Sequence, residues 1–211
     1  MSLPTLKAFI FDMDGTLVDS KLDFDSMREE LSFPKGIPLL EHIEELKAHV
    51  SAERIQYFYD VIHQYEMEGA KASELMPGVS EFLSYLNKEG IKTAVVTRNN
   101  KIVTDITFKK CALEFEMVLT RDCVENPKPH PEGLLTICDE FGIDQQEAVY
   151  MGDFSFDLLA AKNANMKAIL YSPSIKNDLE TMADLTVRCF NNLRNNFSEE
   201  FLRPLGFSTS L

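Results

Sequence analysis

The sequence predicts an α/β protein with a doubly wound parallel sheet as its core and a small all-helical cap inserted after the first strand. Short apolar runs rich in Val, Ile, Phe and Tyr recur without strict alternation of polar residues, which is typical of strands covered on both faces. Amphipathic stretches lie between these runs, and strand-helix-strand alternation favours a parallel sheet. Residues 21–75 interrupt this alternation with helical patterns alone.

Six apolar runs are expected to form the strands of this Rossmann-like core. They are residues 6–11, 92–97, 115–120, 148–151, 167–171 and 185–188. The connecting helices are expected at residues 78–88, 100–110, 132–141 and 157–164. In the first of these helices Val79, Phe82, Leu83 and Leu86 share one face, as expected of a helix that packs on a sheet.

The interruption is expected to be a separate helical cap. Its helices are predicted at residues 23–31, 39–50 and 52–69. Pro77-Gly78 then marks the return to the α/β pattern. The predicted domains are a core of residues 1–19 and 78–211 and a cap of residues 20–77. Residues 191–211 are expected to form a partly packed, mobile tail without an assigned role.

Composition restricts the classes of partner. The 211 residues are 45% apolar and 26% charged, as in ordinary soluble globular proteins, and the net charge of −13 disfavours nucleic acid and anionic membranes. A phosphorylated substrate would be repelled too, so its site would need local positive charge or a metal ion. No secretory signal, membrane-spanning run or Cys-x-x-Cys motif is evident, which predicts a cytoplasmic protein with reduced thiols. The oligomeric state cannot be predicted.

The strongest chemical signal is Asp12-Met-Asp-Gly-Thr16, at the end of the first predicted strand. Residues two apart on a strand point the same way, so Asp12 and Asp14 are expected to project into one small volume. Two carboxylates held that close repel each other unless a cation or a shared proton compensates. Gly15 permits the sharp turn that follows. Spacing alone is also compatible with a polar loop built on an Asx turn.

Three further signals follow later strands. Thr97 ends the second run, where its hydroxyl and the N-terminus of the next helix can bind an anion. A role as the N-cap of that helix is the simpler interpretation of this residue. Lys128 lies between prolines that restrict where its ammonium points, as a phosphate-binding lysine or a surface lysine. Asp153 stands where a metal ligand or an N-cap would stand, and Asp157 is a helix-start carboxylate or a supporting partner.

All four signals fall at carboxyl ends of predicted strands, in an order that resembles the haloacid dehalogenase superfamily of hydrolases. The matching motifs are Asp12-Met-Asp-Gly-Thr16, Thr97, Lys128, and Gly152-Asp153 with Asp157. The resemblance covers the chain outside the insertion, which looks like a small version of the family's helical cap. The layout is most similar to the phosphoglycolate phosphatase-like branch.

The resemblance implies a phosphatase with Asp12 as the nucleophile and Asp14 as the general acid and base. It implies Mg²⁺ as the cofactor, held by Asp12, the backbone carbonyl of Asp14 and the carboxylate of Asp153. Oxygen ligands suit this hard cation. The transferring phosphoryl group would be bound by Thr97 and by groups from two further residues. These are the backbone N–H of Arg98 and the ammonium of Lys128, with Asp157 as an orienting residue.

The substrate class implied is a small phosphorylated metabolite. Arg28 and Lys35 of the cap are candidate substrate contacts, although solvated surface charge is the simpler explanation for both. A phosphosugar mutase and a 2-haloacid dehalogenase share this fold and remain alternatives; the dehalogenase is disfavoured because it uses neither a second aspartate nor Mg²⁺. A non-catalytic phospho-acceptor binding module is a more distant alternative, because its motifs would follow another order.

Overall fold

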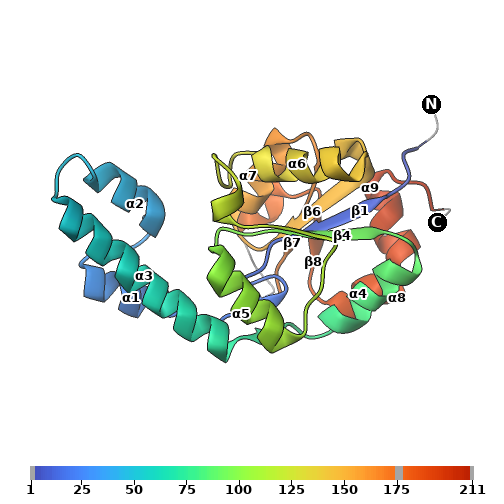
Figure 1. Ribbon diagram of the computed structural model, residues 1–211. Coiled ribbons are helices and arrows are strands. Elements are labelled where there is room, and N and C mark those ends of the chain that lie inside the picture. The colour runs from blue at the N-terminus through green and yellow to red at the C-terminus, as the bar shows by residue number, and fades with distance from the viewer. Residues whose placement is uncertain (1–2, 174–177, 210–211) are drawn as a thin grey trace.

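A six-stranded parallel sheet forms the centre of the protein in the computed structural model, which describes residues 3–173 and 178–209 (Figure 1). In order across the sheet the strands are β5 (Met117–Leu119), β4 (Lys92–Val96), β1 (Ala8–Phe11), β6 (Ala148–Gly152), β7 (Lys167–Tyr171) and β8 (Leu185–Val187). Each neighbouring pair is parallel, and Phe11 lies opposite both Val95 and Met151. The predicted doubly wound parallel sheet is therefore confirmed.

The central strand shows why the apolar runs lack alternation. All four residues of β1 are buried, with Phe9 and Phe11 in one hydrophobic cluster and Ala8 and Ile10 in another. Successive side chains of a strand point to opposite faces, so both faces of the sheet are covered. The first cluster contains most of the buried phenylalanines, whereas small residues such as Ala160 dominate much of the second.

Helices cover both faces of the sheet (Figure 1). One face packs against α6 (Glu132–Phe141) and α7 (Ser155–Asn163). The other packs against α4 (Val79–Lys88), α5 (Lys101–Cys111), α8 (Phe190–Asn195) and α9 (Arg203–Leu205). Short 3₁₀ turns lie at η1 (Arg121–Cys123), η2 (Gln145–Glu147) and η3 (Asp178–Met182). The helices α4 to α7 agree with the predicted positions to within a few residues, whereas α8 and α9 lie where no helix was predicted.

The prediction of a mobile C-terminal tail is wrong for the described part of that segment. A π-helical segment, η4 (Phe197–Leu202), joins α8 to α9, and Phe197, Phe201 and Phe207 are at most 2% exposed. The ring of Phe201 stacks on that of Phe9 with 5.5 Å between their centroids. The segment completes the hydrophobic core because it fills the face of the sheet beside α4. Residues 210–211 lie outside the described residues.

The insertion consists of α1 (Phe24–Leu31), α2 (Leu39–Leu46) and α3 (Ala52–Ala72), which project to one side of the sheet (Figure 1). These helices share a hydrophobic cluster of their own that includes Met27, Ile43 and Phe58. At its base β2 (Val18–Asp19) pairs with β3 (Glu74–Leu75) in a two-stranded antiparallel sheet, which the sequence did not predict. Among the described helices, none is both long and apolar enough to cross a membrane.

Candidate active site

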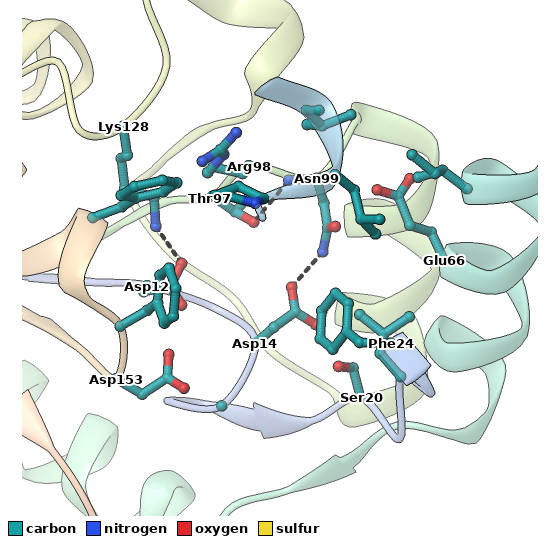
Figure 2. Close-up of a pocket in the computed structure, with 18 of the residues that line it drawn as sticks. Asp12, Asp14, Ser20, Phe24, Glu66, Thr97, Arg98, Asn99, Lys128 and Asp153 are labelled. Atoms are coloured by element: carbon teal, nitrogen blue, oxygen red, sulfur yellow. Dashed lines mark hydrogen bonds and ion pairs between the residues drawn. The ribbon is translucent and has the colours of Figure 1, made fainter. Parts of the chain in front are cut away.

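The predicted site residues meet at the carboxyl edge of the central strands (Figure 2). Asp12 directly follows β1, Thr97 follows β4 and Asp153 follows β6. Because these three strands are neighbours in a parallel sheet, their carboxyl ends lie side by side. Lys128 enters from the loop that precedes α6, and all four residues line one cavity.

Asp12 and Lys128 form a buried ion pair. The Nζ of Lys128 donates a hydrogen bond to Oδ1 of Asp12, as the dashed line in Figure 2 shows. Asp12 is 7% exposed and Lys128 is 5% exposed. Burial raises the pKa of Asp12 well above its usual value, and the ammonium of Lys128 opposes that shift. Burial alone would lower the pKa of Lys128, but Asp12 and Asp157 outweigh it and raise the pKa.

Tyr150 supports this pair, and sequence reasoning missed it. Its hydroxyl accepts a hydrogen bond from Nζ of Lys128 at 2.8 Å and lies 3.0 Å from Oδ1 of Asp157 and 3.1 Å from the carbonyl oxygen of Val96. Lys128 also donates to Asp157 at 2.7 Å, so three partners hold its three N–H groups. The only sequence signal was a tyrosine inside a strand that is otherwise apolar.

Asp157, which the sequence predicts to be an orienting residue, lies beside Lys128 and accepts a hydrogen bond from it. It is 2% exposed at the start of α7, where its Oδ2 accepts a hydrogen bond from the backbone N–H of Phe154 at 3.0 Å. Gly152 lies so close that a Cβ atom there would be 2.3 Å from Cβ of Asp157. The carboxylate therefore caps its helix and orients Lys128 at the same time.

Three carboxylates could hold a metal ion here. One oxygen each from Asp12, Asp153 and Asp157 lie within 4.8 Å of one another. Burial, followed by the charge of Asp157, raises the pKa of Asp153 to about 7, and Lys128 counteracts this shift. A carboxylate set whose charges repel in a buried site fits a hard divalent cation such as Mg²⁺. Both oxygens of Asp157 already have hydrogen-bond partners, whereas Asp12 is engaged through Oδ1 alone, so Asp12 and Asp153 are the carboxylates better placed to bind a cation (Figure 2).

Gly15 allows Asp153 to approach the first motif. The backbone of Gly15 has φ of +77°, and a Cβ atom there would lie 2.2 Å from Oδ2 of Asp153. A side chain at position 15 would thus be strained and would also collide with a predicted metal ligand.

Asp14 lies beside Asp12 and is held by a residue whose role the sequence did not reveal. Asn99 donates a hydrogen bond from Nδ2 to Oδ2 of Asp14 at 2.5 Å (Figure 2). Burial raises the pKa of Asp14, and the hydrogen bonds with Ser20 and Asn99 partly offset this rise. A carboxyl group with a raised pKa is suited to exchange protons near neutral pH.

The loop after β4 carries the predicted anion-binding groups. Thr97 is 3% exposed, and its Oγ1 accepts a hydrogen bond from the backbone N–H of Asn99 at 3.1 Å. The backbone N–H of Thr97 is itself engaged by the carbonyl of Leu119 at 2.9 Å. Among the described residues, no acceptor contacts the backbone N–H of Arg98, which leaves that donor available. The side chain of Arg98 instead forms an ion pair with Glu41 of α2 at 2.5 Å.

The site opens into a cavity of about 660 Å³ between the sheet and the insertion. Arg28 of α1 lines it; its Nη1 donates to the carbonyl of Phe24 at 3.2 Å, and its buried Nε has no partner among the described residues. Lys35 does not line the cavity. Its side chain is 85% exposed, with Nζ 3.9 Å from Asp25, so the structure does not support the prediction that Lys35 contacts substrate.

The insertion contributes mainly apolar groups to the cavity. These are Leu22, Phe24, Met27, Leu39, Leu40 and Ile62, and the core adds the aromatic residues Phe154 and Phe156 to the lining. Glu41 and Glu66 are the carboxylates that α2 and α3 add. Each of them is paired with an arginine of the core, which sequence reasoning also missed.

Curated relatives are found in bacteria and plants. The chain is 32% identical over 166 residues to a haloacid dehalogenase-like hydrolase domain-containing protein of Arabidopsis thaliana, covering 74% of this chain and 66% of that protein. It is 30% identical over 190 residues to a phosphoglycolate phosphatase of Nitrosococcus oceani, covering 77% and 82%. It is also 30% identical over 185 residues to the pyrophosphatase PpaX of Bacillus velezensis, covering 80% and 84%.

Solved structures share the fold. A hydrolase from Pseudomonas syringae superposes with a TM-score of 0.78 at 23% identity, covering 92% of this chain and 98% of the other. A haloacid dehalogenase-like hydrolase from Bacteroides fragilis gives a TM-score of 0.75 at 21% identity, covering 90% and 100%. The sequence model of the haloacid dehalogenase-like hydrolases matches residues 9–171, a segment that contains all four motifs. The protein therefore belongs to the haloacid dehalogenase-like hydrolase family.

Proposed function

We propose that the protein is a Mg²⁺-dependent phosphatase that hydrolyses a small phosphate monoester through an aspartyl-phosphate on Asp12. The observation that carries this proposal is the buried Asp12 carboxylate, held by Lys128 through Oδ1 in a cavity that also contains Asp14 and Asp153. A fixed, desolvated carboxylate beside cationic groups is suited to attack a phosphorus atom. Relatives named phosphoglycolate phosphatase and pyrophosphatase support the same reaction class.

In the first half-reaction, an oxygen of Asp12 attacks phosphorus while the bond to the leaving oxygen breaks. Asp14 gives its proton to that leaving oxygen, so the product departs as an alcohol. The raised pKa of Asp14 keeps a proton available for this step. Thr97, the backbone N–H of Arg98 and Lys128 bind the phosphoryl oxygens as charge shifts toward the leaving group.

In the second half-reaction, water attacks the aspartyl-phosphate. Asp14, now ionised, removes a proton from the water, the bond between phosphorus and Asp12 breaks, and inorganic phosphate leaves. Asn99 holds Asp14 on the cavity side throughout, because its amide donates to the carboxylate. Asp157 and Tyr150 keep Lys128 in place through both steps.

Mg²⁺ would be held by Asp12, the backbone carbonyl of Asp14 and Asp153, and when bound it would neutralise charge on the carboxylates and on the phosphoryl group. The leaving group is proposed to lie against the apolar face of the insertion, with Arg28 as its polar contact. The Nε of Arg28 is buried and has no hydrogen-bond partner among the described residues, so an anionic group on the substrate would satisfy it.

The test is hydrolysis of a generic aryl phosphate with Mg²⁺ and with a chelator, for the wild type, Asp12→Asn and the control Asp105→Asn. Asp105 lies on α5 in an exposed pair with Lys101. Turnover that requires Mg²⁺ and is lost in Asp12→Asn alone supports the proposal. Absence of both turnover and a trapped aspartyl-phosphate would contradict it. Conversion of a sugar phosphate into its isomer would identify a mutase, and Mg²⁺-free release of halide from a 2-halo acid would identify a dehalogenase.

A further inference from the structure

Arg121 joins the helical insertion to the loop that carries Thr97 and Arg98. It is the first residue of η1, the short turn that follows β5. Its guanidinium binds Glu66 of α3 with two hydrogen bonds, Nη1 to Oε1 at 2.8 Å and Nη2 to Oε2 at 3.1 Å. The side chain of Glu66 is 9% exposed and that of Arg121 is 21% exposed. This is a bidentate ion pair between insertion and core that is largely shielded from water.

The same arginine also holds the loop after β4. Nη1 of Arg121 donates to the carbonyl oxygen of Arg98 at 3.1 Å, and its backbone N–H donates to the carbonyl oxygen of Asn99 at 3.0 Å. The first bond fixes one side of the peptide that follows Arg98, and the second fixes the residue that binds Asp14. Arg121 does not line the cavity, so it acts on the site through these two neighbours.

A second contact reaches the same loop from another helix of the insertion. Nη2 of Arg98 lies 2.5 Å from Oε1 of Glu41 on α2, and the guanidinium also stacks over the ring of Phe156 at 4.8 Å. Two carboxylates of the insertion, Glu41 and Glu66, thus converge on the loop 97–99, one directly and one through Arg121. Figure 2 shows Glu66 on the insertion side of the cavity, across from Asp12.

We propose that Arg121 is a positioning residue that couples docking of the insertion to the geometry of loop 97–99. With Glu66 in place, the guanidinium is oriented so that Nη1 reaches the carbonyl of Arg98. When the insertion moves away, this pair breaks and the loop loses one of its restraints. The loop then orders fully only when the insertion is docked. This coupling rests on the proposed function, because it assigns anion binding to Thr97 and Arg98.

The chemistry of the pair explains why arginine is required. A guanidinium offers a planar fork of donors, so it binds both oxygens of Glu66 and still reaches a carbonyl with the same side chain. A lysine at position 121 would keep the charge but would lack the fork. The pair of Arg121 and Glu66 can therefore fix the orientation of the guanidinium relative to loop 97–99, in addition to attracting the insertion to the core.

The experiment compares Glu66→Gln and Arg121→Lys with the matched control Glu68→Gln. Glu68 is an exposed carboxylate on the same helix, bonded to Gln64 of α3 at 3.3 Å and without a contact to the core among the described residues. The first readout is inhibition by inorganic phosphate in the presence of Mg²⁺, together with KM and kcat for an aryl phosphate. The second is hydrogen exchange of the backbone amides of residues 97–104, which does not require turnover.

We expect the inhibition constant of phosphate and the KM to rise roughly tenfold in Glu66→Gln and Arg121→Lys, a typical coupling between sites. Exchange of the loop amides should also accelerate in both variants and stay at wild-type rates in Glu68→Gln. The double variant should be no worse than the worse single variant, because both changes break one interaction. By reciprocity, phosphate should slow exchange in α3 of the wild type and not in Glu66→Gln.

The proposal is overturned if Glu66→Gln and Arg121→Lys lower the unfolding midpoint but leave phosphate inhibition and loop exchange like those of Glu68→Gln. That result would make the pair a structural contact alone. If the wild type hydrolyses no phosphate ester, the proposed function fails, and loop exchange in the three variants still decides whether Arg121 orders the loop.

Discussion

The two walls of the cavity are built on different principles. On the core side, two buried charged groups are held by several partners: Lys128 contacts Asp12, Asp157 and Tyr150, and Asp157 also caps α7. On the insertion side the wall is mainly apolar, and the buried Nε of Arg28 has no partner within the described residues. A saturated network fixes the geometry of a chemical step, whereas an unsaturated donor in an apolar wall leaves room for a ligand. From this contrast we propose that residues at the edge of the sheet carry out the reaction and that the insertion selects the substrate.

The sharpest way to break this comparison is Asp12→Asn. If the core residues carry out the reaction, the kcat of this variant should fall at least about 10⁴-fold, as it does when the nucleophile of other hydrolases is removed. Its fold should persist, because burial raises the pKa of Asp12 and the neutral amide avoids that unfavourable charge. Steady-state kinetics and a thermal melt measure both effects. A variant that retained a tenth of the activity would remove Asp12 from the mechanism.

A second test asks whether the two regions are stabilised separately. Phe201→Ala should lower the free energy of unfolding of the whole core by about 3–5 kcal/mol, because it opens a cavity beside Phe9 and Phe197. Ile43→Ala, in the separate cluster of the insertion, should cost about 2–5 kcal/mol there and accelerate exchange in α1–α3.

Urea unfolding followed by amide exchange separates these outcomes. If Ile43→Ala accelerates exchange in the central strands as much as Phe201→Ala does, the insertion and the core form one cooperative unit, and the comparison between them loses its energetic basis.

A third test measures how the stability of the metal-free protein depends on pH, which reports on the charge of Asp153. The pKa of Asp153 is about 7 in the fold, against an ordinary value of 3.8. The folded state therefore binds more protons between these values, so the stability that protonated Asp153 contributes is present below pH 4 and is lost as pH rises through 7.

Asp153→Asn should remove this dependence. In the presence of a chelator, its Tm at pH 8 should exceed that of the wild type by roughly 5 °C, and the difference should vanish near pH 4. Added Mg²⁺ should raise the Tm of the wild type and not that of the variant. Equal Tm differences at pH 4 and pH 8 would show that repulsion at Asp153 is not responsible.

The smallest expected effect concerns Arg28, the proposed substrate contact of the insertion. Arg28→Gln should lower kcat/KM about tenfold for phosphate esters that carry a second anionic group, since a charge-assisted hydrogen bond is lost. Turnover of an aryl phosphate whose leaving group is uncharged should change little. Lys35→Gln is the control, because that lysine is exposed and outside the cavity. If both variants behave alike on both substrates, Arg28 does not select the leaving group.

The sheet and the predicted motifs could be read from the sequence for physical reasons. Strands buried on both faces require uninterrupted apolar runs, and parallel strands bring their carboxyl ends to one edge. Asp12, Thr97 and Asp153 could therefore be grouped before their distances were known. Tyr150, Asn99 and the pair of Arg121 with Glu66 could not, because their roles depend on which side chains meet across strands and helices that lie far apart in the sequence.

The error at the C-terminal segment had a different cause. Phe190, Leu193, Phe197, Phe201 and Leu205 are spaced three and four residues apart, which is the pattern of an apolar helix face. Asparagines and glutamates lie between these apolar residues. The structure shows that these polar residues lie on the outer side of a segment whose aromatic face completes the core.

The close packing of Gly15 against Asp153 has a consequence for mutational change. A Cβ atom at position 15 would collide with the carboxylate of Asp153, so that side chain would have to leave its position or be replaced to make room for it. Because Asp153 is the proposed metal ligand, such a compensating change would cost the function that it was meant to rescue. A saturation library should find no tolerated residue at position 15 and no second-site suppressor at position 153. Gly15 and Asp153 are therefore expected to be retained as a pair.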